Sequence, residues 1–212
     1  MLIRDYKKED EEAWLRCRVL SFLHTAYFDN VYQKKETYDH PSIELVAVES
    51  GKVIGLIDVE YESEPKSVCT LCSSRGGMIW HLAVHPDFQR QGIGAKLLAA
   101  VEASLKKLGI FELEAWTRDD PWVNDWYRKN GFIKVSSYLH VCIEAEEVRR
   151  AVHSSIAGLR PLGVFAYYSG DNTEKIRKAF HRVHECRGFV KKTKWQFRPV
   201  SLLINEGDFL KW

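Results

Sequence analysis

The segment from Gln89 to Ala95, QRQGIGA, combines residue types suited to binding an anion. Gly92 and Gly94 let the backbone approach a ligand closely. Leucines recur at helical spacing directly after them, so the free N–H groups and partial positive charge of a helix N-terminus fall at this point. Gln89 and Arg90 add side-chain donors. We therefore predict a phosphate or pyrophosphate site.

Asp58 and Glu60 are the carboxylates whose spacing suits acid–base chemistry. They lie two residues apart on a predicted strand, so both face the same side, together with Ile54 and Leu56. A carboxylate over apolar surface can have a raised pKa, which suits a general base. A solvated strand end, or catalysis through ordered water without a single base, are the alternatives. His81 is predicted to be a core histidine.

Two motifs then point to a known family. The order Gln89-x-x-Gly92-x-Gly94, preceded by LAVHP, resembles the acetyl-coenzyme A loop of the GNAT superfamily of N-acetyltransferases. WYRKNGF, residues 126–132, resembles the family's (F/W)-Y-x-x-x-G-F motif. The P-loop ending and the third glycine of a dinucleotide loop are both missing. The resemblance covers residues 1–144.

The resemblance implies a reaction and its residues. Acetyl-coenzyme A would be the co-substrate, and its acetyl group would pass to a primary amine by direct attack within a ternary complex. Tyr127 would be the general acid for the leaving thiolate, with a core tyrosine as the alternative, and backbone N–H groups of residues 82–84 would bind the oxyanion. Transfer of another acyl group and a non-catalytic acyl-coenzyme A sensor stay open. The implied cofactor-binding residues are Leu82, Ala83, Val84, Gln89, Arg90, Gln91, Gly92, Ile93, Gly94 and Ala95.

The elements that must position these residues follow from periodicity and turn signals. Strands are predicted over 1–6, 78–84, 110–116 and 132–145, and a hairpin over 43–62. Helices are predicted over 7–26, 94–109 and 119–131. This order predicts an α/β fold with a mixed central sheet and helices on both faces. The resemblance adds that the fourth and fifth strands splay apart around the cofactor.

Residues 145–212 form an extension that the family motifs do not explain. We predict a helix over 146–158, a strand over 162–170 that could supply the last member of the sheet, and a helix over 171–188. The chain is thus divided into a GNAT-like core, 1–144, and an extension that packs on it. We expect the extension to wall the acceptor site; the alternative is a homodimer arm.

Composition sets wider limits. The 212 residues are 45% hydrophobic and 12% aromatic, which suits one domain with an appendage. No apolar run approaches the length of a membrane span, so no membrane partner is expected. The charged N-terminus differs from a secretory signal, which predicts a cytoplasmic protein.

Five cysteines are scattered along the chain, which does not indicate a disulfide framework. CTLC, residues 69–72, has metal-ligand spacing, and HRVHEC, residues 181–186, could add donors. Since no second cysteine pair exists, we predict no metal site.

Charge is unevenly spread. Residues 1–145 carry 18 Lys/Arg and 22 Asp/Glu, whereas residues 146–212 carry 13 and 7. The basic stretch of the extension is RVHECRGFVKKTKWQFR, residues 182–198. If it walls the acceptor site, it would favour an acceptor with a carboxylate or phosphate beside its amine. No nucleic-acid motif accompanies the basic stretch, so nucleic acid is not expected as a partner. The acceptor, a small molecule or a peptide amine, stays unidentified. Four tryptophans, Trp80, Trp116, Trp122 and Trp126, are candidates for an aromatic pocket or for the core.

Overall fold

The computed structural model describes residues 1–193. They form one sheet with helices on its two faces, which confirms the predicted α/β fold class. The strands are β1 (Leu2–Asp5), β2 (Ser42–Glu49), β3 (Lys52–Tyr61), β4 (Gly76–Val84), β5 (Glu112–Thr117), β6 (Ile133–Glu144), β7 (Gly163–Tyr168) and β8 (Arg182–Lys192). The α-helices are α1 (Glu11–Phe22), α2 (Ile93–Lys107), α3 (Pro121–Lys129), α4 (Glu146–Ala151) and α5 (Thr173–Ala179).

The strand order is β1-β2-β3-β4-β5-β8-β6-β7. Every neighbouring pair is antiparallel except β4 and β5. The strand that lies between β5 and β6 is β8, which comes from the predicted extension. Residues 182–192 are therefore an internal part of the same sheet as the first 144 residues.

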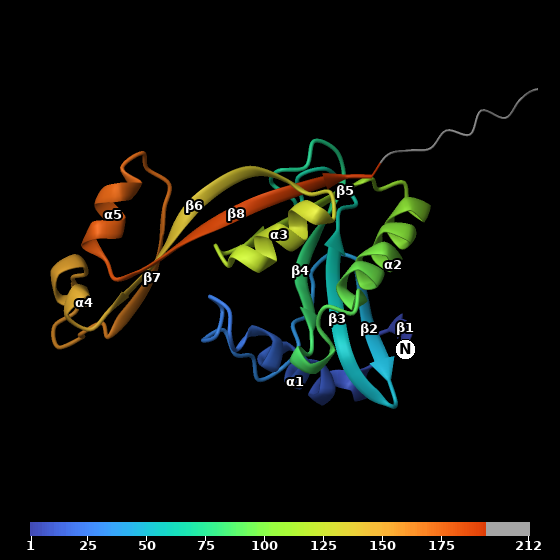
Figure 1. The fold of residues 1–212 in the computed structure, drawn as a ribbon. Helices are drawn as coiled ribbons and strands as arrows, with labels where there is room; N and C mark the ends of the chain where they lie inside the picture. Colours follow the sequence, from blue (N-terminus) through green and yellow to red (C-terminus); the bar gives the residue numbers. More distant parts are fainter. Residues whose placement is uncertain (194–212) are drawn as a thin grey trace, which may run out of the picture.

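Two apolar clusters lie on opposite faces of the sheet (Figure 1). One joins α2 and α3 to the sheet through residues such as Leu97, Tyr127 and Val59. The other packs Trp14 and Cys17 of α1 against the sheet. The alternation of β3 explains the division, because neighbouring strand residues face opposite sides.

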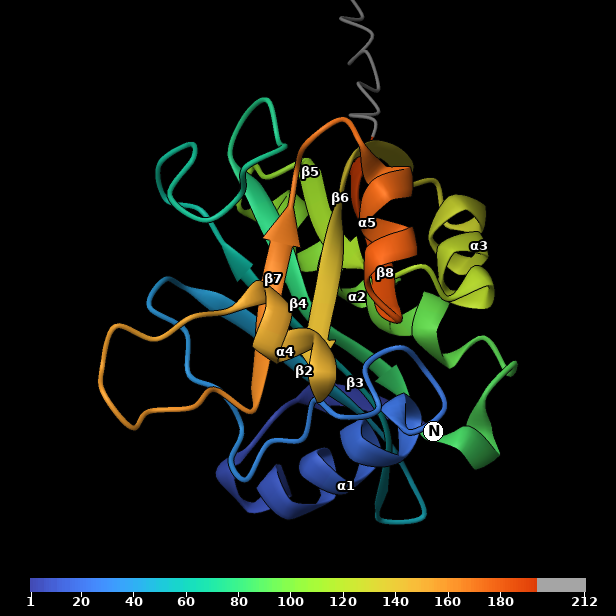
Figure 2. The same ribbon diagram turned by 90° about the vertical axis from the view of Figure 1, so that its left-hand side faces the viewer.

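Beyond the main core, β6 and β8 continue as a ribbon that carries β7, α4 and α5 (Figure 1). We call residues 137–187 the arm. Figure 2 views the molecule from the side of the arm, with α4 and α5 toward the viewer. Its own apolar cluster includes Leu139, Val141 and Val148.

The predicted helix over 171–188 is wrong in its second half. The helix α5 ends at Ala179, and β8 begins at Arg182. The reason is tertiary: β8 pairs with β5 on one side and with β6 on the other. Pairing on both sides outweighs a weak local helix preference. The predicted helix over 146–158 is likewise shorter and ends at Ala151.

Candidate active site

The parallel pair β4 and β5 separates partway along its length. Pairing is confined to Gly76–Ile79 with Glu112–Ala115. At the point of separation the β3–β4 register shifts, so that Asp58 pairs with His81 but Val59 pairs with Ile79. Trp80 is the extra residue, and such a bulge bends a strand. The structure thus shows a split between residues 80–84 of β4 and residues 116–117 of β5.

The backbone register shows which β4 groups face this split. His85 N donates to Ile54 O at 2.9 Å, so residue 85 bonds toward β3. Because backbone groups alternate along an antiparallel strand, Ala83 also bonds toward β3, whereas Leu82 and Val84 project their N–H and C=O groups toward the split. Val84 O accordingly accepts a bond from Gln89 Nε2 at 3.0 Å.

The glycine loop adjoins the end of β4. Arg90 has φ +62° and Gly92 has φ +78°, so two positions within three residues adopt the left-handed conformation. A non-glycine residue in this region is strained, and such strain tends to gather at ligand-binding loops. The first bond of α2 runs from Lys96 N to Gly92 O at 3.1 Å. The N–H groups of residues 93–95 precede that bond, so they point out of the helix N-terminus.

Gly92 and Gly94 have different roles. A Cβ at Gly92 would meet nothing within 4 Å, so this glycine is needed for its backbone angle and for open space. A Cβ at Gly94 would lie 3.4 Å from the Trp126 ring, so Gly94 sits where α2 and α3 approach each other. Only Gly92 therefore offers a test of ligand approach that leaves the packing of α3 intact.

Tyr127 lies at the apex of the split. Its ring stacks on Phe189 at 5.4 Å, and Phe189 pairs with Ala115, the last β5 residue that pairs with β4. The side chain is 6% exposed, and burial raises the pKa of its hydroxyl. The hydroxyl takes part in none of the side-chain hydrogen bonds found within residues 1–193. It is therefore a protonated group with its bonding capacity free.

Asp58 is buried in an ion-pair network. Its Oδ2 lies 2.7 Å from Lys35 Nζ and accepts a 2.9 Å bond from the Tyr38 hydroxyl. Burial raises the pKa of Asp58, although Lys35 opposes the rise. Asp58 Oδ1 is buried and has no hydrogen-bond partner in the described part of the chain. The raised pKa predicted for a carboxylate on this strand thus holds for Asp58.

Glu60 is different, and its expected pKa rise is wrong. Burial acts to raise the pKa of Glu60, but hydrogen bonds outweigh it, and the pKa lies below its ordinary value. His40 N and Nδ1 lie 2.9 and 3.0 Å from Oε1, and Trp80 Nε1 lies 2.7 Å from Oε2. Glu60 is therefore ionised at neutral pH.

The shared face predicted for the strand needs one correction. Leu56 belongs to the cluster on the α1 side, but Ile54 belongs to the cluster on the α2 side. A register shift between Ala47 and Val48 lets Val53 and Gly55 pair with consecutive β2 residues and leaves Ile54 out of the alternation. His81 is 4% exposed and lies against Trp14, so its prediction as a core histidine is confirmed.

A cavity of about 660 Å³ opens beside Glu60 and Trp80. Its remaining lining comes from residues 31–39, the segment between α1 and β2. Sequence reasoning missed this segment because it has no regular period. The run YQKKETYDH, with two tyrosines among charges of both signs, is the signal that could have drawn attention to it.

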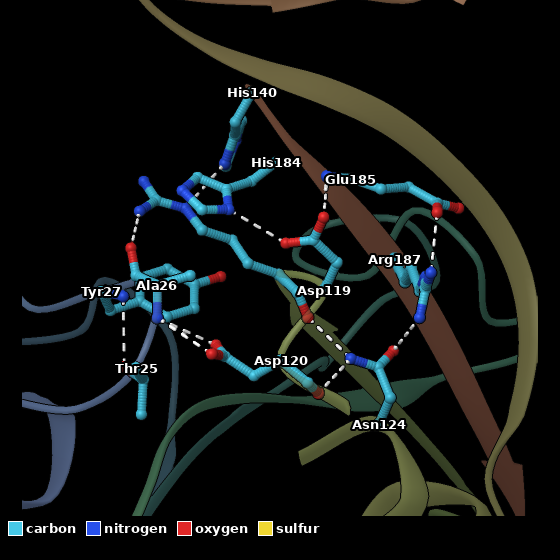
Figure 3. A network of polar contacts seen from close by, with 11 residues as sticks. Thr25, Ala26, Tyr27, Asp119, Asp120, Asn124, His140, His184, Glu185 and Arg187 are labelled. Atoms are coloured by element: carbon cyan, nitrogen blue, oxygen red, sulfur yellow. Dashed lines mark hydrogen bonds and ion pairs between the residues drawn. The ribbon is translucent and has the colours of Figure 1, made fainter. Parts of the chain in front are cut away.

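Polar contacts tie the arm to the core near the split (Figure 3). Arg118 donates to the Ala26 carbonyl and, through Nε, to His140 Nδ1 at 3.2 Å. His184 Nδ1 lies 3.0 Å from Asp119 Oδ1. Burial lowers the pKa of His140 to about 4, with Arg118 adding to the effect, so this ring is neutral near pH 7.

The four tryptophans do not meet in one pocket. Trp80 lines the cavity, Trp126 packs at Gly94, Trp122 is 58% exposed, and Trp116 lies against Tyr138 at 5.3 Å. The pattern of four similar residues therefore did not identify a site.

Within the described residues, Lys191 and Lys192 of the basic stretch do not line the cavity. Lys191 pairs with Glu102 of α2, and Lys192 Nζ lies 3.1 Å from Glu112. Lys194 lies outside the described residues. The arm instead turns Phe165 toward the core, 5.2 Å from the Arg118 guanidinium. The basic wall of the acceptor site therefore stays a prediction.

Comparison with known proteins shows which family the chain resembles. Residues 41–134 match the family model described as an acetyltransferase (GNAT) domain. S-alkylcysteine N-acetyltransferase of Bacillus subtilis (strain 168) is 28% identical over 107 residues, which is 49% of this chain and 57% of the relative. The chain thus spans little more than half the length of this curated relative.

Solved structures agree on the fold. A GNAT-family acetyltransferase from Streptococcus pneumoniae has a TM-score of 0.56 at 13% identity and covers 91% of this chain and 99% of its own. PaiA N-acetyltransferase from Thermoplasma acidophilum, solved in complex with coenzyme A, has a TM-score of 0.54 at 16% identity, with coverage of 91% and 98%. None of the helices within residues 1–193 is long and apolar enough to cross a membrane.

Proposed function

We propose, because residues 41–134 match the family model of a GNAT acetyltransferase domain, that the chain is an N-acetyltransferase that moves the acetyl group of acetyl-coenzyme A to a primary amine. The observation that carries the proposal is the pair of neighbouring groups of outward N–H donors, one on Leu82 and Val84 and the other in the first turn of α2. Such donors suit a thioester carbonyl at one end and a pyrophosphate at the other.

The cofactor would lie along this run. Its pyrophosphate would bind the N–H groups of residues 91–95 with the side chains of Gln89 and Arg90, and its pantetheine arm would enter the split beside residues 82–84. A charge-assisted bond from Arg90 to a phosphate contributes about 1.5–3 kcal/mol. The acetyl carbonyl would then lie near the apex of the split, next to Tyr127.

Direct attack within a ternary complex completes the reaction. The amine nitrogen forms a bond to the carbonyl carbon, and the carbon–sulfur bond breaks. Tyr127 gives its proton to the thiolate as general acid, and the proton that the nitrogen loses as the amide forms replaces the one that Tyr127 gave. The amine must be free of its extra proton, although an alkyl ammonium has a pKa near ~10. Ionised Glu60 both attracts the ammonium and accepts that proton.

Asp58 is the second candidate base. Its oxygen Oδ1, which has no partner in residues 1–193, could hold a water that relays a proton from the cavity. The geometry favours Glu60, because Glu60 lines the cavity whereas Asp58 is fully buried behind Lys35. Catalysis through such a water, with no side chain in direct contact, is the alternative to either base.

The acceptor would bind in the cavity beside Glu60. Trp80, 47% exposed, and Tyr32 offer flat apolar surfaces for the body of the molecule. Lys34 lines the same cavity and could pair with a carboxylate. The curated relative is named for S-alkylcysteine, so amino acids with an apolar side chain are the first acceptors to test.

The test is thiol release with acetyl-coenzyme A and a panel of amines. The wild-type protein should release coenzyme A in step with N-acetylated product, and Glu60→Gln should reduce that rate. Glu64→Gln, in an exposed loop, is the matched control. Tight binding of the cofactor without release for any amine would favour the sensor, and turnover only with a longer thioester would favour another acyl group.

A further inference from the structure

The loop between β3 and β4 brings two thiols and a carboxylate together at the other end of the β4–β5 pair. The Sγ atoms of Cys69 and Cys72 and a carboxylate oxygen of Glu114 all lie within 4.8 Å of one another. Cys69 is 1% exposed, and Cys72 and Glu114 are fully buried. Two cysteines on one loop and a third donor from a neighbouring strand are a common arrangement in metal sites.

The charge around this cluster is negative and lacks a counter-ion. Glu62 and Glu114 are both fully buried, and neither forms an ion pair within residues 1–193. Lys66, the nearby cation, bonds to the carbonyls of Thr70 and Cys72 and to neither carboxylate. Buried charges are ordinarily paired or coordinate a metal. A bound cation would supply the missing positive charge.

The surroundings also hold the donors in place. Glu114 accepts bonds from Thr70 Oγ1 at 2.9 Å, Trp116 Nε1 at 2.7 Å and Leu71 N at 2.6 Å. Such outer contacts orient the ligands of metal sites. A Cβ at Gly76 would lie 2.5 Å from Cys72 Sγ and 3.0 Å from Cys69 Sγ, so a glycine is required for both sulfurs to reach this position.

From this geometry we propose that Cys69, Cys72 and Glu114 bind a zinc ion. Two thiolates and one carboxylate suit a borderline-soft divalent cation. With Zn–S near ~2.3 Å, tetrahedral ligand atoms lie roughly 3.5–3.8 Å apart, so their present separations of up to 4.8 Å would have to shorten by about 1.3 Å or less. A water would take the fourth position. The site is independent of the proposed acetyl transfer.

The sequence pointed to different additional ligands. His184 lies 3.0 Å from Asp119, and Cys186 pairs with Tyr138, both within the arm. Neither belongs to the cluster of Cys69, Cys72 and Glu114. The third ligand comes instead from β5, the strand against which the loop folds.

Binding should release protons and depend on pH. Each thiol must lose its proton to coordinate zinc. Zinc affinity should therefore weaken as the pH falls below neutral.

Metal analysis of the purified protein is the first experiment. We expect about one zinc per chain, or binding of one equivalent when chelator-treated protein is titrated with zinc. Cobalt in its place should give a thiolate-to-cobalt charge-transfer band. The double variant Cys69→Ser, Cys72→Ser should lose binding and the band, whereas Cys142→Ser, a buried cysteine on β6, should keep both.

Glu114→Gln keeps the shape of the side chain and should weaken zinc binding roughly 10–100-fold. It also keeps the proposal testable if the double variant fails to fold. The proposal is overturned if wild-type protein binds no zinc, if the double cysteine variant binds zinc as well as wild type, or if mass spectrometry shows Cys69 and Cys72 joined as a disulfide under reducing purification.

Discussion

The two ends of the β4–β5 pair treat backbone N–H groups in opposite ways. The closed end consists of residues 76–79, residues 112–115 and the loop 62–75. There, buried carboxylates of the protein accept hydrogen bonds from the N–H groups of the loop. Glu62 accepts from Val68, Cys69 and Gly76. At the open end, residues 80–84 and 116–117, the β4 N–H groups that face the split have no strand partner.

This difference in hydrogen bonding indicates where a ligand can bind. An unpaired N–H group in a protein interior is costly, so it is satisfied from inside the chain or from outside it. The closed end uses glutamates for this purpose and is sealed. The open end leaves its donors to an external acceptor, and the same strand thereby serves stability at one end and binding at the other.

Removing the Tyr127 hydroxyl should have the largest effect and is confined to the open end. Tyr127→Phe keeps the ring stacked on Phe189, so folding and cofactor affinity should be unchanged. Loss of a general acid typically costs ~10²–10⁴-fold in rate. We expect a fall of that order in kcat, measured by thiol release.

Tyr168→Phe is the matched control, because its hydroxyl bonds only to the Asn172 N–H of the arm. It should keep wild-type turnover. Equal kcat for Tyr127→Phe and wild type would make Tyr127 a core residue and remove the acid from the apex of the split.

Blocking the glycine loop should have the second largest effect, a loss of affinity for coenzyme A. Gly92→Val places a branched side chain at φ +78° and fills the space that the pyrophosphate would occupy. We expect at least a ~100-fold weaker Kd for coenzyme A by calorimetry, which corresponds to about 2.7 kcal/mol.

Gly51→Val supplies the control, since Gly51 has φ +75°, also with nothing within 4 Å of a built Cβ, at the β2–β3 turn. Both variants should lose about 1–2 kcal/mol of stability from the strained backbone. If both variants bind coenzyme A equally well, the loop is not the cofactor site.

At the closed end, Glu62→Gln should lower stability and leave the affinity for coenzyme A unchanged. The amide group would face an N–H donor where a carboxylate oxygen now accepts one, so the free energy of unfolding should fall by roughly 2–3 kcal/mol. Affinity for coenzyme A should stay unchanged at temperatures where the protein is folded. Denaturant titration and calorimetry measure the two quantities.

The exposed Glu64→Gln should alter neither quantity. A loss of coenzyme A affinity in folded Glu62→Gln, comparable to its loss of stability, would show that the two ends are coupled and would break the comparison.

Acidic pH should lower the free energy of unfolding through protonation of His140, which lies beside the open end. Its folded pKa, about 4, lies below the unfolded value of about 6.5, so the unfolded chain binds the proton first. The stability that this group contributes is complete above pH 6.5 and is lost as the pH falls toward 4. The loss is up to about 3 kcal/mol, less where water reaches the ring.

Replacing the ring should flatten this dependence. His140→Gln should show a smaller drop in unfolding free energy between pH 6.5 and 4 than wild type, whereas His153→Gln, at an exposed position, should follow wild type. Parallel curves for wild type and His140→Gln would assign the acid sensitivity to other groups.

The sequence alone determined the elements with strong local signals. The leucine period after Gly94, the turn at Ser50 and Gly51, and the Pro121 start of α3 each specify their structure within a few residues, and α2, the β2–β3 hairpin and α3 formed there. The glycine loop and the WYRKNGF segment likewise pointed to the family whose model matches residues 41–134, because ligand-binding loops require particular residues at particular spacings.

Tertiary structure decided the rest. Residues 182–192 form the strand β8 because they pair with β5 on one side and with β6 on the other. No local sequence pattern encodes two partners that are distant along the chain. The opposite pKa shifts of Asp58 and Glu60, two residues apart on one strand, arise because His40 and Trp80 bond to one carboxylate while burial dominates at the other. Glu114 joins Cys69 and Cys72 across more than 40 positions of sequence for the same reason: burial and pairing bring together groups whose separation along the chain carries no signal.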